Sequence, residues 1–413
     1  MSLSNIYLPL SLTLISLNNN LFTSLDGIIL PENLEDLYLN DNQIISISGF
    51  IFPPTLIHLS LMKNLIDSLD DVIFPENLEK ISLNNNLITS LAGVIFPENL
   101  DEISLDDNLI TSLVDVIFPD NLVEILLNAN QITSFEGVHF PDNLEFLELN
   151  NNQITSLIGI DLCLNLISLS INGNQITTLN EIILPATLES ILLNNNQIIS
   201  LNQVVFPENL VHLHLSNNQI TSLNEVIFPT NLEFLTLINN QITSPLNITF
   251  PPNIKELYLS NNQITSLNGI NLPLNLENLY LSNNQITSLV EIFFPPTLKI
   301  IKVNNNQITS LVGVILPENL EIISLINNKI TSLVNVVFPP ELKLLELIKN
   351  KITSLNNINF PQELEVLGLN DNQITSLAGV IFPASLKKLF LKGNPIILPL
   401  VFNNPLNLEI ILN

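Results

Sequence analysis

An asparagine recurs at every 22nd position of this chain, from Asn20 through to Asn394, without one exception. A spacing this strict means that one structural unit is copied along an axis. A solenoid of such units grows by adding turns and needs no central core. We therefore expect one domain, residues 1–413, of about 18 repeats of 22 residues with partial repeats at the ends.

Each repeat also carries the same proline and apolar residues. The frame of one repeat is Pro31, Leu34, Leu37, Leu39 and Asn42. A proline opens every repeat except one, where Cys163 replaces it. The frame continues without insertion to the end of the chain, where Leu408 and Ile411 take the places of Leu386 and Leu389.

The pattern Leu-x-x-Leu-x-Leu-x-x-Asn-x-Ile resembles the signature of the leucine-rich repeat family, and it covers essentially the whole chain. The 22-residue period and the recurring Asn-Gln-Ile-Thr, as at residues 152–155, resemble the internalins. The proline three residues before the first leucine resembles the repeats of secreted bacterial effectors. The resemblance implies an α/β-type leucine-rich repeat solenoid, a horseshoe or superhelix with a parallel sheet on its concave side.

Alternating side chains place a strand in each repeat. In residues 37–40, leucine alternates with Tyr38 and Asn40, which is the pattern of a strand buried on one side. Stacked copies give a parallel sheet of about 19 strands. The residues between each asparagine and the next proline have no helical period. We expect short extended or 3₁₀ segments on the convex side and few or no α-helices.

The repeated asparagine is predicted to be structural. Its side chain offers both donors and an acceptor, so a ladder of asparagines can satisfy backbone groups buried where the chain turns after each strand. The clearest members of this ladder are Asn42, Asn64, Asn86, Asn108, Asn130, Asn152, Asn174, Asn196, Asn218, Asn240, Asn262 and Asn284.

Three apolar residues in a row precede many of the prolines, as at residues 94–96. An extended chain cannot bury all three on one side, because successive side chains point in opposite directions. Two readings stay open. Either a bent arc covers the middle residues, or they form an apolar ridge on the convex surface, a candidate for lateral association. These residues are Ile29, Ile51, Ile73, Ile95, Ile117, Ile183 and Ile227.

Charge limits the choice of partners. The net charge is −27, and arginine is absent. Residues 1–206 hold 25 carboxylates against 2 lysines, whereas residues 207–413 hold 14 against 10. Such a chain should repel nucleic acid and anionic membranes, since phosphate binding needs clustered basic residues. A basic protein or peptide suits the acidic half, although the charge also serves solubility.

Outward positions on the sheet vary between repeats, so a binding site is sought there. They are acidic early (Asp36, Glu102, Asp106, Glu124), aromatic in the middle and apolar late (Ile300, Ile322, Leu344, Val366). Aromatic clusters are common interface anchors, although such a row is also found as plain cross-strand packing. The predicted partner-binding residues are His212, His214, Phe234, Ile238, Tyr258, Tyr280 and Lys302.

Catalysis and cofactors are not expected. The chain has no nucleophile elbow, phosphate loop or run of metal ligands. His212 and His214 project to one side of a strand and could in principle chelate zinc, but no third ligand is evident, so no metal site is predicted. The predicted function is a non-catalytic scaffold that binds a protein or peptide through its concave face. The alternative is a structural protein that self-associates through uncapped ends or the convex ridge.

Compartment is inferred from what the sequence lacks. A single cysteine excludes an intramolecular disulfide. Residues 12–17 are apolar but lie in the repeat register and follow no basic region, so they are read as the first strand and not as a secretion signal. Polar residues interrupt every turn, so no membrane insertion is expected. The prediction is the cytosol or a host cytoplasm.

Overall fold

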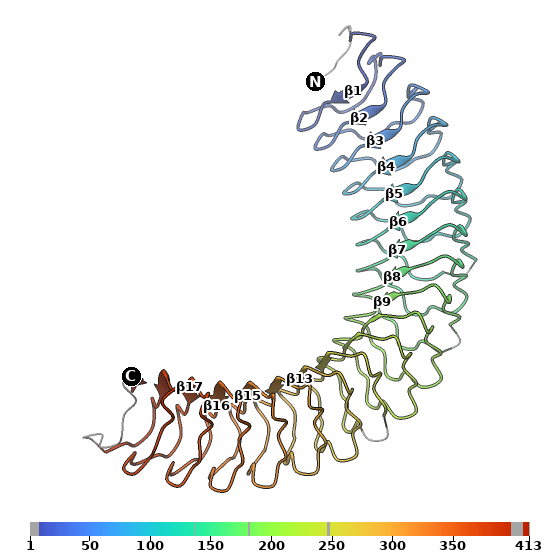
Figure 1. Ribbon diagram of the computed structural model, residues 1–413. Helices are drawn as coiled ribbons and strands as arrows, with labels where there is room; N and C mark the ends of the chain where they lie inside the picture. Colours follow the sequence, from blue (N-terminus) through green and yellow to red (C-terminus); the bar gives the residue numbers. More distant parts are fainter. Residues whose placement is uncertain (1–7, 136, 181, 246–247, 398–407, 413) are drawn as a thin grey trace. The chain divides into compact units, whose positions relative to one another are not determined.

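The computed structural model describes residues 8–135, 137–180, 182–245, 248–397 and 408–412 (Figure 1). They belong to two compact units. Unit 1 comprises residues up to Ile198 together with Val204–Leu210, and unit 2 comprises Ile199–Gln203 together with the residues from Val211 onward. The single domain expected from the repeats stays a prediction.

Each repeat contributes one strand of three residues (Figure 1). The strands of unit 1 are β1 (Leu14–Ser16), β2 (Asp36–Tyr38), β3 (His58–Ser60), β4 (Lys80–Ser82), β5 (Glu102–Ser104), β6 (Glu124–Leu126), β7 (Phe146–Glu148), β8 (Ser168–Ser170) and β9 (Ser190–Leu192). The strands of unit 2 are β10 (His212–His214), β11 (Phe234–Thr236), β12 (Glu256–Tyr258), β13 (Asn278–Tyr280), β14 (Ile300–Lys302), β15 (Ile322–Ser324), β16 (Leu344–Glu346), β17 (Val366–Gly368), β18 (Lys388–Phe390) and β19 (Glu409–Ile411).

Within each unit every strand pairs in parallel with the strand of the next repeat. The middle residue of each strand points inward, so Leu37 lies opposite Leu59, and both are 1% exposed. The predicted leucine-rich repeat solenoid, with a parallel sheet and without helices, is confirmed. The described part of the chain contains no helix, and so none long and apolar enough to cross a membrane.

The last strand departs from the 22-residue frame. The 22-residue frame predicts that Leu389 of β18 lies opposite Ile411, but it lies opposite Ile410. A shift of one residue exchanges the two faces of a strand, and in β19 both isoleucines are only half-buried. The expectation of an unbroken frame to the end is therefore wrong. Of the uncapped ends invoked for self-association, residues 1–7 and residue 413 lie outside the described residues.

The asparagine ladder expected from the sequence is present, and Asn64 shows its geometry. Its Nδ2 donates to the carbonyls of Leu61 and Leu39, each at 3.0 Å, and its Oδ1 accepts the Ile44 N–H, also at 3.0 Å. The Asn64 side chain therefore bonds to its own repeat and to two places in the preceding repeat, the end of the strand and the segment that follows the asparagine. Asn64 is only 5% exposed, so water cannot easily replace these bonds.

The back of each turn, meaning the segment opposite the strand, is extended chain joined by single turns. The Ser90 hydroxyl accepts the Ala92 N–H at 3.1 Å, which is the local side-chain-to-backbone bonding typical of serine in turns. Phenylalanines stack between repeats along this segment. Phe96 lies 6.1 Å from Phe74 and 6.4 Å from Phe118, with nearly parallel rings.

The middle residue of each apolar triplet faces solvent. Ile95 is 81% exposed, while Val94 and Phe96 on either side of it are buried. This is the alternation of an extended chain with one side in the core. The reading in which a bent arc covers these residues is wrong, and an apolar ridge is present on the back of the turns.

Cys163 occupies a proline position and is buried as a packing residue. Its Sγ donates to the Leu144 carbonyl at 3.2 Å. Burial raises the pKa of the Cys163 thiol to about 11, so the thiol stays protonated at neutral pH and is a poor nucleophile.

Replacing one ladder residue tests how much the chain depends on this bonding. Asn196→Leu removes the donor to the Ile171 and Leu193 carbonyls and the acceptor for the Ile176 N–H. At about 1 kcal/mol for each buried group left without a partner, we expect a loss of roughly 3 kcal/mol in the free energy of unfolding. Urea denaturation measures it. Gln197→Leu, on the exposed next residue, is the matched control. Equal midpoints for the two variants would contradict the ladder's role.

Candidate functional site

The predicted contact residues lie on the outward face of the sheet in unit 2. In strands β10 to β14 the middle residue is buried in the core, so the first and third residues point to the opposite side. Tyr258 and Tyr280 lie directly opposite each other on β12 and β13, as their repeat positions predict. Phe234 on β11 lies diagonally beside Tyr258, because its direct partner is Glu256.

These side chains form a continuous aromatic row. The ring centroids of His214 and Phe234 are 4.8 Å apart, and those of Phe234 and Tyr258 are 5.8 Å apart. Tyr258 and Tyr280 stack at 4.7 Å with only 8° between their planes. The Lys302 Nζ lies 5.6 Å from the Tyr280 ring centroid, within the range of a cation–π contact. The row therefore crosses five neighbouring strands.

A carboxylate bonds the hydroxyl of Tyr258, a contact that the sequence reasoning missed. The Tyr258 hydroxyl donates to Glu256 on the same strand, and the Asn278 amide donates to the other oxygen of that carboxylate at 2.9 Å. Alternation places Glu256 and Tyr258 on one face, two residues apart, so the strand pattern contained the signal. The partners of the carboxylate are thus set before any ligand binds.

Both tyrosines stay neutral over the physiological range. Burial raises the pKa of Tyr258, and the hydrogen bond and negative charge of Glu256 raise it further. Burial, followed by the charge of Glu256, also raises the pKa of Tyr280. The pair presents two phenol rings, and neither hydroxyl is poised to act as a base.

The two histidines differ in environment. His214 is half-buried against Phe234, whereas His212 is exposed, with its ring centroid 6.2 Å from that of Phe234. Burial lowers the pKa of His214, and the nearby His212 lowers it further. Among the residues that the structure describes, no group of three His, Cys, Asp or Glu side chains is placed to hold a metal ion.

The remaining contact residues lie at the margins of the row. Ile238 follows β11 and is half-buried. Beyond Lys302 the face becomes aliphatic, because Ile300, Ile322 and Leu344 lie opposite one another on successive strands and are half-buried. The sheet face of unit 2 thus changes from aromatic to aliphatic along its length.

The early acidic positions in unit 1 are partly engaged within the sheet. Asp36 lies 2.6 Å from the His58 ring nitrogen, and Glu102 lies 2.7 Å from the Lys80 Nζ. Burial raises the pKa of Glu124, and the nearby charges of Glu102 and Glu148 raise it further. Ionised carboxylates crowd this face with few cations to offset them.

A second row of charges in unit 2 escaped the sequence reasoning. Three ion pairs join neighbouring repeats: Lys299 with Glu277 at 2.6 Å, Lys343 with Glu321 at 2.8 Å, and Lys387 with Glu365 at 2.8 Å. They belong to an alternation at one repeat position, Lys255, Glu277, Lys299, Glu321, Lys343, Glu365 and Lys387. A search for sign changes every 22 residues would have found it. Exposed pairs add little stability, but they neutralise the flank of the sheet.

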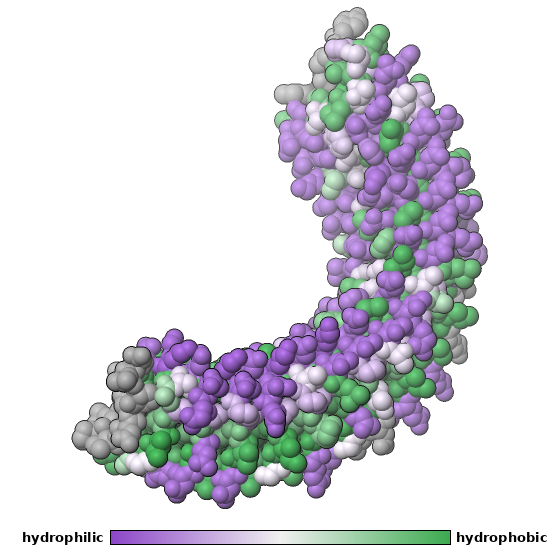
Figure 2. Space-filling view, viewed as in Figure 1, coloured by the Kyte–Doolittle hydropathy of each residue, from purple (hydrophilic) through white to green (hydrophobic). Residues whose placement is uncertain are grey.

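Figure 2 shows how polarity is distributed over the viewed face. Isolated green, hydrophobic side chains are set among purple polar ones over the β1–β9 part of the chain. Larger green patches lie beside the β15–β17 part, next to the strand edge. On the viewed face, the apolar patches of unit 2 are thus larger than those of unit 1.

Comparison with known proteins agrees with the fold. Residues 252–293 match the family described as Leucine Rich repeats (2 copies), and residues 209–230 match the family described as Leucine Rich Repeat. The solved structure of YopM from Yersinia enterocolitica is 27% identical with a TM-score of 0.72, covering 97% of this chain and 86% of that one. No curated protein is similar enough in sequence to count as a relative.

Two other structures share the fold at lower identity. A leucine-rich repeat protein of Leptospira interrogans is 23% identical with a TM-score of 0.52, covering 94% of this chain and 92% of that one. The functional domain of InlJ from Listeria monocytogenes is 20% identical with a TM-score of 0.57, covering 80% of this chain and 71% of that one. At these identities the likeness concerns the fold alone.

A titration tests the packing of the aromatic row. Because burial disfavours the charged imidazolium, we expect the NMR titration midpoint of His214 to lie below the ordinary histidine value of 6.5. A lowered folded-state pKa also means that stability is lost as pH falls through the unfolded-state value. Phe234→Ala removes the ring against His214 and should move the midpoint back up. An unchanged midpoint would show that this ring does not bury the imidazole.

Proposed function

Because this chain is a leucine-rich repeat protein, we propose that it is a non-catalytic scaffold that binds a protein or peptide through the outward face of its sheet, the concave side predicted from the sequence. The contact residues in this proposal are His212, His214, Phe234, Ile238, Tyr258, Tyr280 and Lys302. Repeat proteins of this kind serve as protein-binding scaffolds, and the position of the site is our inference.

The continuous aromatic row is the observation that carries the proposal. Four rings and one lysine follow one another across neighbouring strands at centroid separations between 4.7 and 5.8 Å. Stacked rings lose little conformational entropy on binding, because their neighbours already fix their rotamers. They also offer wide apolar area beside polar hydroxyl groups, which is the chemistry of interface anchors.

The surroundings of the row indicate what kind of segment it accepts. The aliphatic residues Ile322 and Leu344 extend the apolar surface of the sheet beyond the aromatic row. The alternating lysines and glutamates leave the flank of the sheet nearly neutral. We infer a partner segment with aromatic or aliphatic side chains over Tyr258 and Tyr280. A basic partner, considered from the overall charge, fits unit 1 better than this face.

A non-catalytic role fits the chemistry of the row. The tyrosines have raised pKa values, and the Tyr258 hydroxyl is already bound to Glu256. The histidines lie on an open sheet face, without a carboxylate among their ring contacts to orient them as a base. Self-association, the alternative from the sequence, is favoured by one observation, the exposed ridge on the back of the turns.

A double substitution tests the site. A pull-down with the full chain would first isolate a partner, and titration calorimetry would then compare its affinity for the wild type and for Tyr258→Ala/Tyr280→Ala. We expect the affinity to fall by about tenfold or more, since buried aromatic anchors are worth at least about 1–2 kcal/mol. Both rings lie outward on the sheet, so the thermal unfolding midpoint should change little.

Tyr38→Ala is the matched control. Tyr38 occupies the same position in its repeat as Tyr258. Its hydroxyl also donates to a carboxylate on its own strand, that of Asp36, at 3.5 Å. It lies in unit 1, outside the aromatic row, and its loss should leave the affinity unchanged. If the double variant binds as tightly as the wild type, or if Tyr38→Ala weakens binding equally, the site is not the aromatic row.

A further inference from the structure

The back of unit 1 carries an apolar ridge that the fold does not require. Five isoleucines, at the same position of successive repeats, are between 78% and 88% exposed. We call them the isoleucine ridge, and they are Ile29, Ile51, Ile73, Ile95 and Ile117. Several equivalent positions elsewhere are also apolar and exposed, such as Ile183, Ile227 and Ile315. Five others hold exposed polar residues, namely His139, Asp161, Thr249, Asn271 and Asn359. Polar side chains are therefore tolerated there, and packing does not explain the isoleucines.

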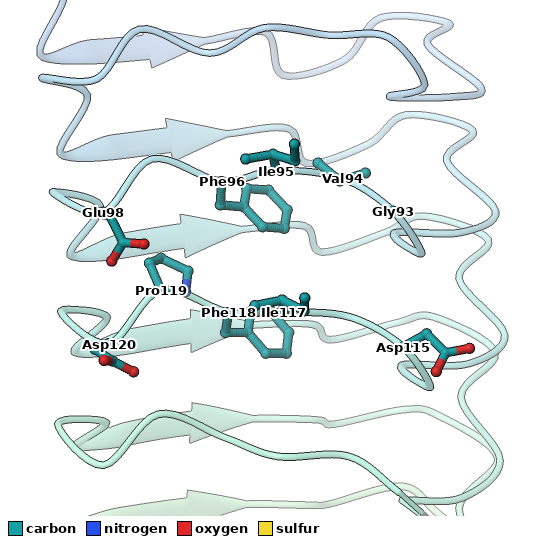
Figure 3. Close-up of a pocket in the computed structure, with 10 residues that line it drawn as sticks. All are labelled: Gly93, Val94, Ile95, Phe96, Glu98, Asp115, Ile117, Phe118, Pro119 and Asp120. Carbon is teal, nitrogen blue, oxygen red and sulfur yellow. The ribbon is translucent and has the colours of Figure 1, made fainter.

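Carboxylates border the ridge on both sides. Ile95 and Ile117 line a pocket of about 350 Å³ between adjacent repeats, together with Glu98, Asp115 and Asp120 (Figure 3). In the close-up Glu98 and Asp120 lie toward one end of the two isoleucines and Asp115 toward the other. Further exposed carboxylates occupy the same two positions in other repeats, namely Glu32, Asp71, Glu76 and Asp142.

No cation of unit 1 offsets these charges. Its two lysines lie on the sheet side, where Lys63 is 3.6 Å from Asp41 and Lys80 pairs with Glu102. None of the ion pairs found among the described residues uses Glu98, Asp115 or Asp120. The combination is an apolar strip with a row of solvated negative charge along one side and two carboxylates, Asp71 and Asp115, along the other.

We propose that the isoleucine ridge of unit 1 binds a basic amphipathic helix of a partner protein. Leucine-like side chains of such a helix seat between the isoleucines, and lysines or arginines on its flanks reach the carboxylates. The spacing supports a helix. The phenylalanines next to the ridge lie 6.0 to 6.4 Å apart from repeat to repeat, and residues i and i+4 of a helix are about 6 Å apart along its axis.

Other occupants fit less well. Two copies of unit 1 placed ridge to ridge would bring like-charged rows together without a cation between them. An anionic lipid surface would be repelled by the same carboxylates. The ridge is also bounded, because the next two repeats hold His139 and Asp161 at its position, paired at 3.6 Å. Five repeats at the phenylalanine spacing match a helix of about 17 residues.

The experiment uses the full chain and a synthetic helical peptide of about 18 residues, with leucines along one face and lysines on both flanks. Fluorescence anisotropy measures its affinity. A peptide of the same composition in an order that gives no apolar face is the first control, because it keeps the charge. We expect the amphipathic peptide to bind about tenfold or more tightly than the scrambled one.

Two sets of variants locate the contact. Ile73→Thr/Ile95→Thr/Ile117→Thr places at the ridge a residue that the chain already uses at position 249, so the fold should be kept, as circular dichroism would check. It should abolish the preference for the amphipathic peptide. The matched control, Phe293→Thr/Ile315→Thr/Val337→Thr, alters equally exposed residues of unit 2, where the equivalent pocket is lined by one carboxylate, Glu318. It should leave binding unchanged.

Charge and competing occupants are tested separately. Glu98→Gln/Asp115→Asn/Asp120→Asn should weaken peptide binding, and added salt should weaken it for the wild type. Three results would overturn the proposal: the isoleucine-to-threonine variant keeps the preference; the ridge binds phosphatidylcholine vesicles and not the peptide; or sedimentation shows a dimer of the full chain that this variant dissociates. None of these outcomes bears on the aromatic row.

Discussion

The fold depends on how the buried backbone is satisfied where each strand ends. Each strand is only three residues long, so its hydrogen-bonded ladder ends early. The backbone N–H and C=O groups that follow would be buried without hydrogen-bond partners. The ladder asparagine resolves this, because its amide bonds the carbonyls of two successive repeats and its oxygen accepts an N–H of the preceding repeat, as Asn64 does. Each repeat is thus completed by its neighbour, and an isolated repeat cannot satisfy its own turn.

This bonding leaves the two surfaces of each turn free to differ. Leucines such as Leu37 and Leu59 are fixed by the core, but the residues on either side of them point to solvent and can vary. In unit 2 that freedom holds an aromatic row on the sheet, stiffened by stacking and by the bond from Tyr258 to Glu256. A partner that meets rings already in place loses less entropy on binding.

The back of the turns is varied in a different way. There the chain is extended, and the residue between two buried neighbours, such as Ile95, must face water. Polar residues at equivalent positions show that the fold accepts either kind of side chain. A run of isoleucines bordered by carboxylates is therefore a property of the surface of unit 1. The sheet of unit 2 and the back of unit 1 differ in polarity as well as in position, so the chain has room for two kinds of contact.

The sequence by itself determined the repeat, the strand in each turn, the inward leucines and the asparagine ladder. All of these follow from spacing, and a period of 22 residues maps each position onto the next turn. It also placed Tyr258 and Tyr280 on neighbouring strands. Only the tertiary structure decided the exposure of Ile95, the shift that pairs Leu389 with Ile410, the hydrogen bond from Tyr258 to Glu256 and which of the alternating charges form ion pairs. Spacing fixes which residues are neighbours, whereas burial and bonding depend on the path of the backbone and on which rotamers bring two side chains together.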